Sequence, residues 1–146
     1  MNSRLQSRWW IALPACTLAL LVWTYQPASR PSSPTSAHAV DVETGHQQRR
    51  SGITVEDSGR VERLLQDDRD GSHHQRFLIR LASGRTVLIA HNIDLAPRVP
   101  ISPDDSVTVH GEYEYNEKGG VIHRTHHDPE GKRPGGWIRF DSREYR

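Results

Sequence analysis

The sequence predicts an all-β fold, a small five-stranded barrel that follows an N-terminal hydrophobic helix and a disordered tether. Apolar and polar residues alternate along short stretches after Gly59, and glycine-containing turns separate these stretches. No window of helical length in this region carries apolar residues at positions i, i+3 and i+4. The 146 residues allow one ordinary domain. We therefore divide the chain into residues 1–25, 26–50 and 51–146.

The first segment has the pattern of an export signal. Arg4 and Arg8 precede an apolar run from Trp9 to Tyr25, and the positive end of such a segment stays in the cytoplasm. The run is slightly short for a membrane span, which needs roughly 20 apolar residues. An uncleaved inner-membrane anchor and a signal peptide cleaved after Ala37-His38-Ala39 both remain open, and the residues around Cys16 loosely resemble a lipoprotein cleavage box. In each case we expect the domain on the periplasmic side or secreted.

Residues 26–50 read as a disordered linker. They are rich in Pro, Ser, Ala, Thr and Gln and contain few large apolar residues. Such a segment cannot bury enough surface to offset its conformational entropy. We expect it to act as an extended tether.

The remaining residues predict strands at about 59–66, 75–81, 86–92, 107–115 and 121–127. Three prolines between Ile93 and Asp105 leave room for at most one helical turn there, and residues 135–140 can add a short strand. A three-stranded meander, a connection and a final hairpin are the pattern of the OB barrel. Closure of the sheet would remove its edges, which helps a domain that has no cysteine and hence no disulfide.

The charge of the domain disfavours nucleic acid as a partner. Residues 51–146 hold 14 Lys and Arg against 16 Asp and Glu, a net charge of 14 − 16 = −2. Domains that bind the phosphate backbone usually present a basic surface. We expect the partners to be an envelope ligand or protein and, through the N-terminal segment, the membrane.

The candidate binding residues are polar side chains near predicted strand ends, where the scaffold would hold them in place. They are His74, Gln75, Arg76, His91, Asn92, Asp94, Arg98 and Trp137. Two structural alternatives remain open. His91, Asn92 and Asp94 could instead bond to loop amides, and Arg76 could lie on a solvated face.

Histidine is the commonest metal ligand, and His123, His127 and Asp128 form the densest cluster. Two histidines four residues apart on a strand need a bend to reach one ion, and Pro129 makes a bend plausible. His91 or His74 would supply a further ligand. No cofactor is firmly indicated, and Zn²⁺ or another divalent metal is the one that these residues could hold. Polar histidines on an exposed strand are the alternative.

Other chemistries find little support. Asp67-Asp68-Arg69-Asp70-Gly71 has the carboxylate spacing of a calcium loop but lacks its remaining ligands, so we interpret it as a polar turn. The sequence contains no GxSxG, phosphate-loop or HExxH motif. A nucleophilic triad is therefore unsupported.

Several motifs together resemble the bacterial domain-of-unknown-function family 3465 over about residues 59–145. They are Asp67–Gly71, His74-Gln75-Arg76-Phe77, Ala90–Arg98, Gly119–His123, Thr125–Pro129 and Gly136-Trp137-Ile138. The resemblance implies a small, usually exported proteobacterial protein and no defined activity. It also implies a Trp before Thr125, where this chain has Arg124.

The leading hypothesis for function is a non-enzymatic binding module for a glycan, peptide or protein, since OB barrels present their second and third strands to ligands. A metal-dependent hydrolase of the nuclease or phosphodiesterase type, with His91, His123, His127 and Asp128 at its centre, is the alternative. A third hypothesis is a pH-responsive role of the clustered histidines.

Overall fold

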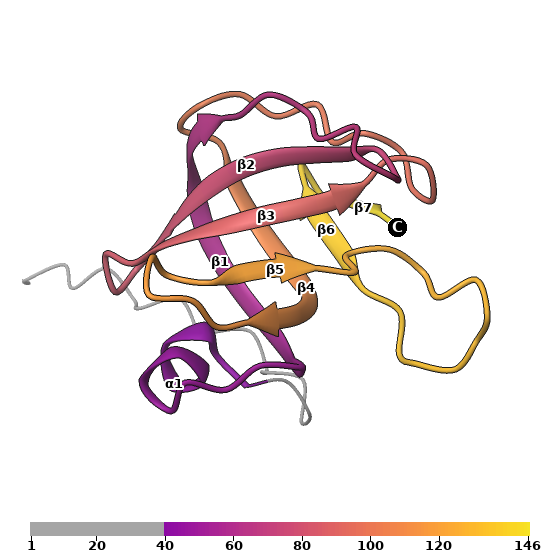
Figure 1. The fold of residues 1–146 in the computed structure, drawn as a ribbon. Coiled ribbons are helices and arrows are strands. Elements are labelled where there is room, and N and C mark those ends of the chain that lie inside the picture. Colours follow the sequence, from indigo (N-terminus) through magenta and orange to yellow (C-terminus); the bar gives the residue numbers. More distant parts are fainter. Residues whose placement is uncertain (1–39) are drawn as a thin grey trace, which may run out of the picture. The chain divides into compact units, whose positions relative to one another are not determined.

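The structure is a computed structural model that describes residues 40–146 (Figure 1). The predicted signal or anchor, residues 1–25, and the tether up to residue 39 lie outside the described residues. The elements are α1 (Val42–Gln47), β1 (Ile53–Leu64), β2 (His74–Leu81), β3 (Thr86–Asn92), β4 (Ser106–Glu114), β5 (Val121–His123), β6 (Trp137–Phe140) and β7 (Arg143–Tyr145). In this part of the chain, no helix has the length and apolar character needed to cross a membrane.

Five of the strands close into a barrel, as the sequence predicts. Their order is β1-β2-β3-β5-β4, and β4 pairs back onto β1. The β3–β5 pair is parallel, and the other pairs in the barrel are antiparallel. β1 pairs with two strands at once, because Gly59 and Arg60 pair with β2 on one side and with β4 on the other. A Cβ on Gly59 would lie 2.9 Å from the carbonyl oxygen of Arg80, so the glycine permits this close approach.

The core fills the inside of the barrel. Alternate residues of β2, β3 and β4 are buried, which is the period-2 pattern of strands with one face inward. Phe77, Ile79, Ile89 and Tyr113 are among the largest fully buried side chains. The Tyr113 hydroxyl donates to the carbonyl oxygen of Gly119 at 3.1 Å, which satisfies its polar end inside the core.

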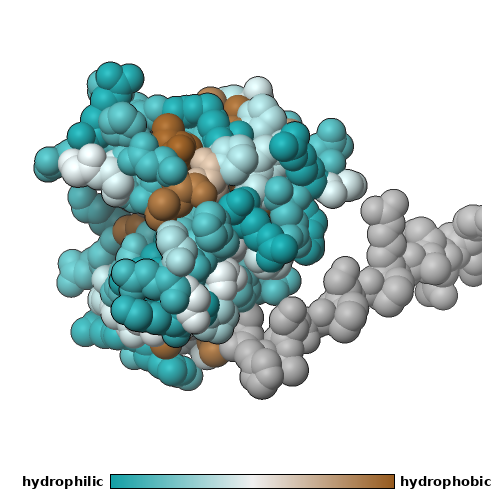
Figure 2. All heavy atoms as spheres, turned by 90° about the vertical axis from the view of Figure 1, so that its right-hand side faces the viewer, coloured by the Kyte–Doolittle hydropathy of each residue, from teal (hydrophilic) through white to brown (hydrophobic). Residues whose placement is uncertain are grey.

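The C-terminal residues extend the sheet beyond the barrel. β6 pairs with β4 and β7 pairs with β6, both antiparallel. The sequence predicts one short strand here, and the structure has two. Figure 2 shows that the side of the domain on the right in Figure 1 is mainly hydrophilic, with some hydrophobic side chains near its middle and a few at its upper and lower edges.

The folded part begins before residue 51, where the sequence places the end of the tether. Asp41 caps α1 by accepting from the Thr44 amide at 2.7 Å, and Val42 is fully buried in the barrel core. The Glu43 carboxylate accepts from two nitrogens of Arg85, at 2.8 and 2.9 Å. Expecting disorder for residues 41–50 is therefore wrong. These six helical residues have little helix signal of their own, and contacts with distant strands hold them in place.

Two strand boundaries also differ from the expected ones. β1 begins at Ile53 and not near Gly59, because its first half pairs with β4. β5 ends at His123, four residues earlier than predicted, since Arg124 has a φ of 52° and leaves the extended conformation. The connection between β3 and β4 contains no helix, in agreement with its three prolines.

Candidate functional site

All the predicted binding residues except Trp137 lie at one end of the β2–β3 hairpin or in the connection that follows it. His74 pairs with Asn92, Gln75 with His91, and Arg76 with Ala90 across the hairpin. Asp94 and Arg98 come next in the chain. Trp137 lies on β6, where its ring stacks on His110 at 5.4 Å between centroids. The hairpin register thus brings together two motifs that are separate in the sequence.

The two inward-facing members of this group, His91 and Gln75, form hydrogen bonds inside the protein. His91 is fully buried, and its Nε2 lies 3.1 Å from the carbonyl oxygen of Pro97 while its Nδ1 lies 2.8 Å from Thr125 Oγ1. A carbonyl only accepts, so Nε2 carries the proton and Nδ1 accepts from the Thr125 hydroxyl. Burial lowers the pKa of His91 to about 4. Gln75 donates to the carbonyl oxygen of Val99 at 2.8 Å and accepts from its amide at 2.9 Å.

The remaining members of the group bond mainly to loops, and one of them, Asn92, is itself buried. Asn92 accepts from the amide of Asp94 at 2.9 Å, and Asp94 accepts from the amide of His73 at 2.8 Å. Arg98 forms an ion pair with Asp67 in the β1–β2 loop. Asn92 and Asp94 thus make the contacts with loop amides that the sequence offers as the structural alternative, whereas His91 bonds to a loop carbonyl and to the Thr125 hydroxyl. His74 and Arg76 line a depression on the outer face of the barrel, described below.

The four predicted metal ligands do not come together. Both ring nitrogens of His91 are already engaged in hydrogen bonds, one with Thr125 and one with Pro97. Asp128 accepts from the amide of Lys132 at 2.6 Å and pairs with Arg133 at 3.0 Å. His127 is exposed, because the chain leaves β5 at Arg124. Of the four, only His123 belongs to a group of metal-ligating side chains in residues 40–146.

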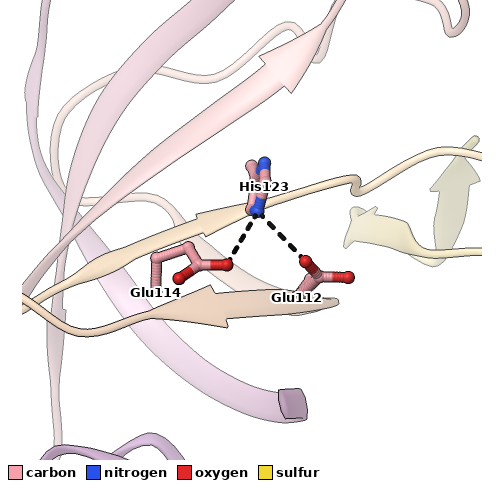
Figure 3. Close-up of side chains that lie close together, drawn as sticks. All are labelled: Glu112, Glu114 and His123. Carbon is pink, nitrogen blue, oxygen red and sulfur yellow. Dashed lines mark ion pairs between the residues drawn. The ribbon is translucent and has the colours of Figure 1, made fainter. Parts of the chain in front are cut away.

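That group consists of His123, Glu112 and Glu114. His123 on β5 pairs directly with Glu112 on β4, and Glu114 lies two residues further along the same face of β4. The Nε2 atom of His123 lies 3.6 Å from Oε1 of Glu112 and 3.8 Å from Oε1 of Glu114. Figure 3 shows the ring directed toward the two carboxylates from the neighbouring strand. The three ligand atoms all lie within 4.8 Å of one another.

The two carboxylates of the group have no positive charge on His123 to balance them. Nε2 of His123 is buried and finds no hydrogen-bond partner among the described residues. Burial lowers the pKa of His123 more than Glu112 and Glu114 raise it, so the imidazole is neutral at neutral pH. Arg124 pairs with Oε2 of Glu112 at 2.5 Å, which leaves Oε1 facing the histidine. Two carboxylates therefore face a neutral ring nitrogen.

His123 and Glu114 also border a shallow depression of about 280 Å³ on the outer face of the barrel. It is lined by side chains from four strands and the β1–β2 loop, namely Asp68, His74, Arg76, Ala90, Glu114, Val121 and His123. Next to it, Leu78 and Leu88 pair across the outer face of β2 and β3 and are only partly buried. The outer face thus combines an aliphatic floor with a charged rim.

A larger open groove of about 860 Å³ lies where β1 passes between β2 and β4. No histidine lines it, and its arginines are already engaged. Arg80 pairs with Glu62, Arg139 with Glu144, and Arg60 donates to the carbonyl oxygen of Asp104. None of the predicted site residues lies in this groove.

The sequence does not single out Glu112 and Glu114 as site residues. Both stand on the polar face of the most regular predicted strand, so their outward direction is readable from the alternation. Their proximity to His123 is not, because it depends on the register between β4 and β5. Two glutamates at positions i and i+2 of one strand, followed after a tight turn by a strand that contains a histidine, are the sequence pattern that could have indicated this group.

The family model described as "Protein of unknown function (DUF3465)" matches residues 25–146. The match confirms the resemblance drawn from the motifs and extends it to residues before Gly59. No protein with a curated description matches the chain.

Proposed function

Because the chain belongs to the family of proteins of unknown function DUF3465 and its domain is a closed barrel, we propose that it is an exported, non-enzymatic binding module of the cell envelope. Its ligand is a protein or peptide that lies on the outward face of β2, β3 and β5. The observation that carries this proposal is the depression on that face, with its charged rim, beside the partly buried pair of Leu78 and Leu88.

The position of the depression supports the proposal. The order of the barrel strands and the parallel β3–β5 pair support our proposal that the barrel is OB-like. Barrels of this kind hold ligands on the face of the second and third strands and on the loops between strands 1 and 2 and strands 4 and 5. The depression is lined from β2 and β3, and Asp68 contributes from the β1–β2 loop.

The chemistry of the face favours a protein ligand over a sugar. Within β2, β3 and β5, the side chains that alternate with the buried ones include Arg76, Leu78 and Leu88, and no aromatic residue stands among them. Protein interfaces combine an apolar centre, arginine and a polar rim. Residues 51–146 also carry a net charge of −2, from 14 Lys and Arg and 16 Asp and Glu, which disfavours nucleic acid.

The hydrogen bonds of the described histidines support a non-enzymatic role. The hydroxyl groups that bond to histidine belong to Thr125, held by His91, and Tyr113, held by His46. Both hydroxyl-bearing residues are fully buried, so a substrate cannot reach them. The metal-dependent hydrolase with His91, His123, His127 and Asp128 at its centre loses support, since His91 and Asp128 are engaged elsewhere and only His123 belongs to a group of metal-ligating side chains in residues 40–146.

In-cell photo-crosslinking tests the proposal. A photoreactive amino acid replaces Leu88 on the proposed face or, as the matched control, Ser58 on the outward side of β1. We expect one discrete protein adduct from position 88, its loss when Arg76→Glu is added, and no such adduct from position 58. Equal adducts from both positions, or none from position 88, would contradict the proposal. A glycan adduct at position 88 would overturn the ligand class.

A further inference from the structure

We propose that Glu112, Glu114 and His123 form a binding site for one divalent transition-metal ion of the Zn²⁺ type on the outer face of the barrel. The inference does not depend on the proposed protein ligand, because the ion would bind to the purified chain alone.

The spacing of the three ligand atoms suits such an ion. Zn²⁺ binds imidazole nitrogen and carboxylate oxygen at about 2.0–2.2 Å, and in tetrahedral geometry its ligands then lie about 3.3–3.6 Å apart. The separations between Nε2 of His123 and the two carboxylate oxygens are 3.6 and 3.8 Å. The two distances from Nε2 therefore need to shorten by a few tenths of an ångström at most, and all three ligand atoms already lie within 4.8 Å of one another.

The same separations are too long for good hydrogen bonds. A hydrogen bond from Nε2 to a carboxylate would lie at about 2.7–2.9 Å. Nε2 is nevertheless buried and has no other partner in residues 40–146. A cation between the nitrogen and the two oxygens would satisfy all three atoms at once. This unpartnered nitrogen is the observation, independent of the acidic residues, that points to an ion.

The surroundings orient the ligands and leave room for a further one. Arg124 binds the outer oxygen of Glu112 at 2.5 Å and so directs the inner oxygen toward His123. Glu114 and His123 border the depression of about 280 Å³, so a fourth position can be filled by water or by an atom of a bound ligand. One nitrogen and two oxygen donors favour Zn²⁺ and neighbouring transition metals over Ca²⁺ and Mg²⁺, which take mainly oxygen ligands.

The test measures metal binding to the untagged full chain. Zn²⁺ titration gives stoichiometry and affinity, Co²⁺ reports a four-coordinate site by its visible absorption, and NMR of the imidazole nitrogens identifies the ring that binds. The ligand variants are His123→Ala and Glu114→Gln. The matched controls are His73→Ala, an exposed histidine, and Glu56→Gln, a glutamate on β1 outside the group. Circular dichroism checks that every variant is folded.

We expect one Zn²⁺ per chain, with the His123 nitrogen signal shifted. Each ligand variant should weaken binding by roughly tenfold or more, since loss of even an outer-shell partner costs about 10–100-fold. The controls should bind within about twofold of the parent chain. The inference is overturned if the folded parent chain takes up no stoichiometric Zn²⁺, or if His123→Ala binds as tightly as His73→Ala. In that case the group is an ion pair that forms only when His123 is protonated.

Discussion

At the scale of single residues, the histidines of this domain differ in role because they differ in surroundings. His91 is enclosed, neutral and bonded at both ring nitrogens. His123 is half-buried and faces two carboxylates without a hydrogen bond to either. His127 is exposed. Histidine content alone therefore indicates no common metal centre, and each ring has to be judged from its own partners.

The buried state of His91 predicts a specific dependence of stability on pH. Its pKa is about 4 in the folded protein and near 6.5 in the unfolded chain, so between these values the unfolded chain binds the extra proton. The stabilisation is complete above pH 6.5, is lost as the pH falls toward 4, and changes no further below that. The full effect amounts to about 3 kcal/mol.

We expect His91→Gln, which keeps a donor and an acceptor, to flatten the pH dependence of the free energy of unfolding between pH 6.5 and 4.5. Urea titrations of both proteins at several pH values measure it. His46, His123 and His126, whose pKa values are also lowered, are present in both proteins, and their effects cancel in the comparison. Parallel curves for the two proteins would show that His91 is not the buried group responsible.

At the scale of elements, the helix α1 belongs to the barrel, although the residues around it have the composition of a linker. Val42 is fully buried, and His46 lies 3.0 Å from the hydroxyl of the core residue Tyr113. Arg85, in the turn before β3, holds the pKa of Glu43 at about 2. One apolar side chain and two long-range polar contacts thus anchor a helix of six residues.

We expect Val42→Ala to lower the free energy of unfolding by about 2 kcal/mol, because it leaves a cavity in the core. Gln48, exposed at the C-terminal end of α1, provides the control, and Gln48→Ala should change stability by less than about 0.5 kcal/mol. Chemical denaturation of both variants gives the comparison. A Val42→Ala variant as stable as the Gln48→Ala variant would mean that α1 does not contribute to the cooperative fold.

At the scale of the whole molecule, closure of the barrel creates the candidate site. β4 and β5 form the last hairpin of the barrel, and β3 pairs with β5 in parallel, so side chains from β2, β3, β4 and β5 share one outer face. His74 and Arg76 reach this face from the second strand, and His123 and Glu114 reach it from the other side. The binding face therefore depends on pairings between strands far apart in the sequence.

The proposed location of the domain outside the cytoplasm can be tested by an export experiment. We expect a reporter enzyme that is active only outside the cytoplasm to be active when fused after Arg146 of the full chain. Replacing the apolar run from Trp9 to Tyr25 with a polar segment should abolish this activity, because the run directs membrane insertion. The mass of the exported chain then distinguishes an uncleaved anchor from a cleaved signal. Undiminished activity of the polar-segment variant would contradict export through this segment.

Local patterns in the sequence were sufficient to predict the barrel and to identify the family. Period-2 alternation identified the strands because residues on a strand face opposite sides in turn, and three prolines excluded a helix between β3 and β4. The motifs around His74, His91 and Trp137 pointed to the family that the model match confirms. Only the register of the β2–β3 hairpin in the structure placed Gln75 opposite His91 and His74 opposite Asn92.

Long-range packing decided the rest. Whether Val42 is buried, whether His91 is free, and which residues surround His123 depend on contacts 34 or more positions apart, or on the register of one strand against another. A single strand shows which way a side chain points, but not what it meets there. The pairing of Glu112 with His123 arises from the β4–β5 register, and the turn at Arg124 separates His123 from His127.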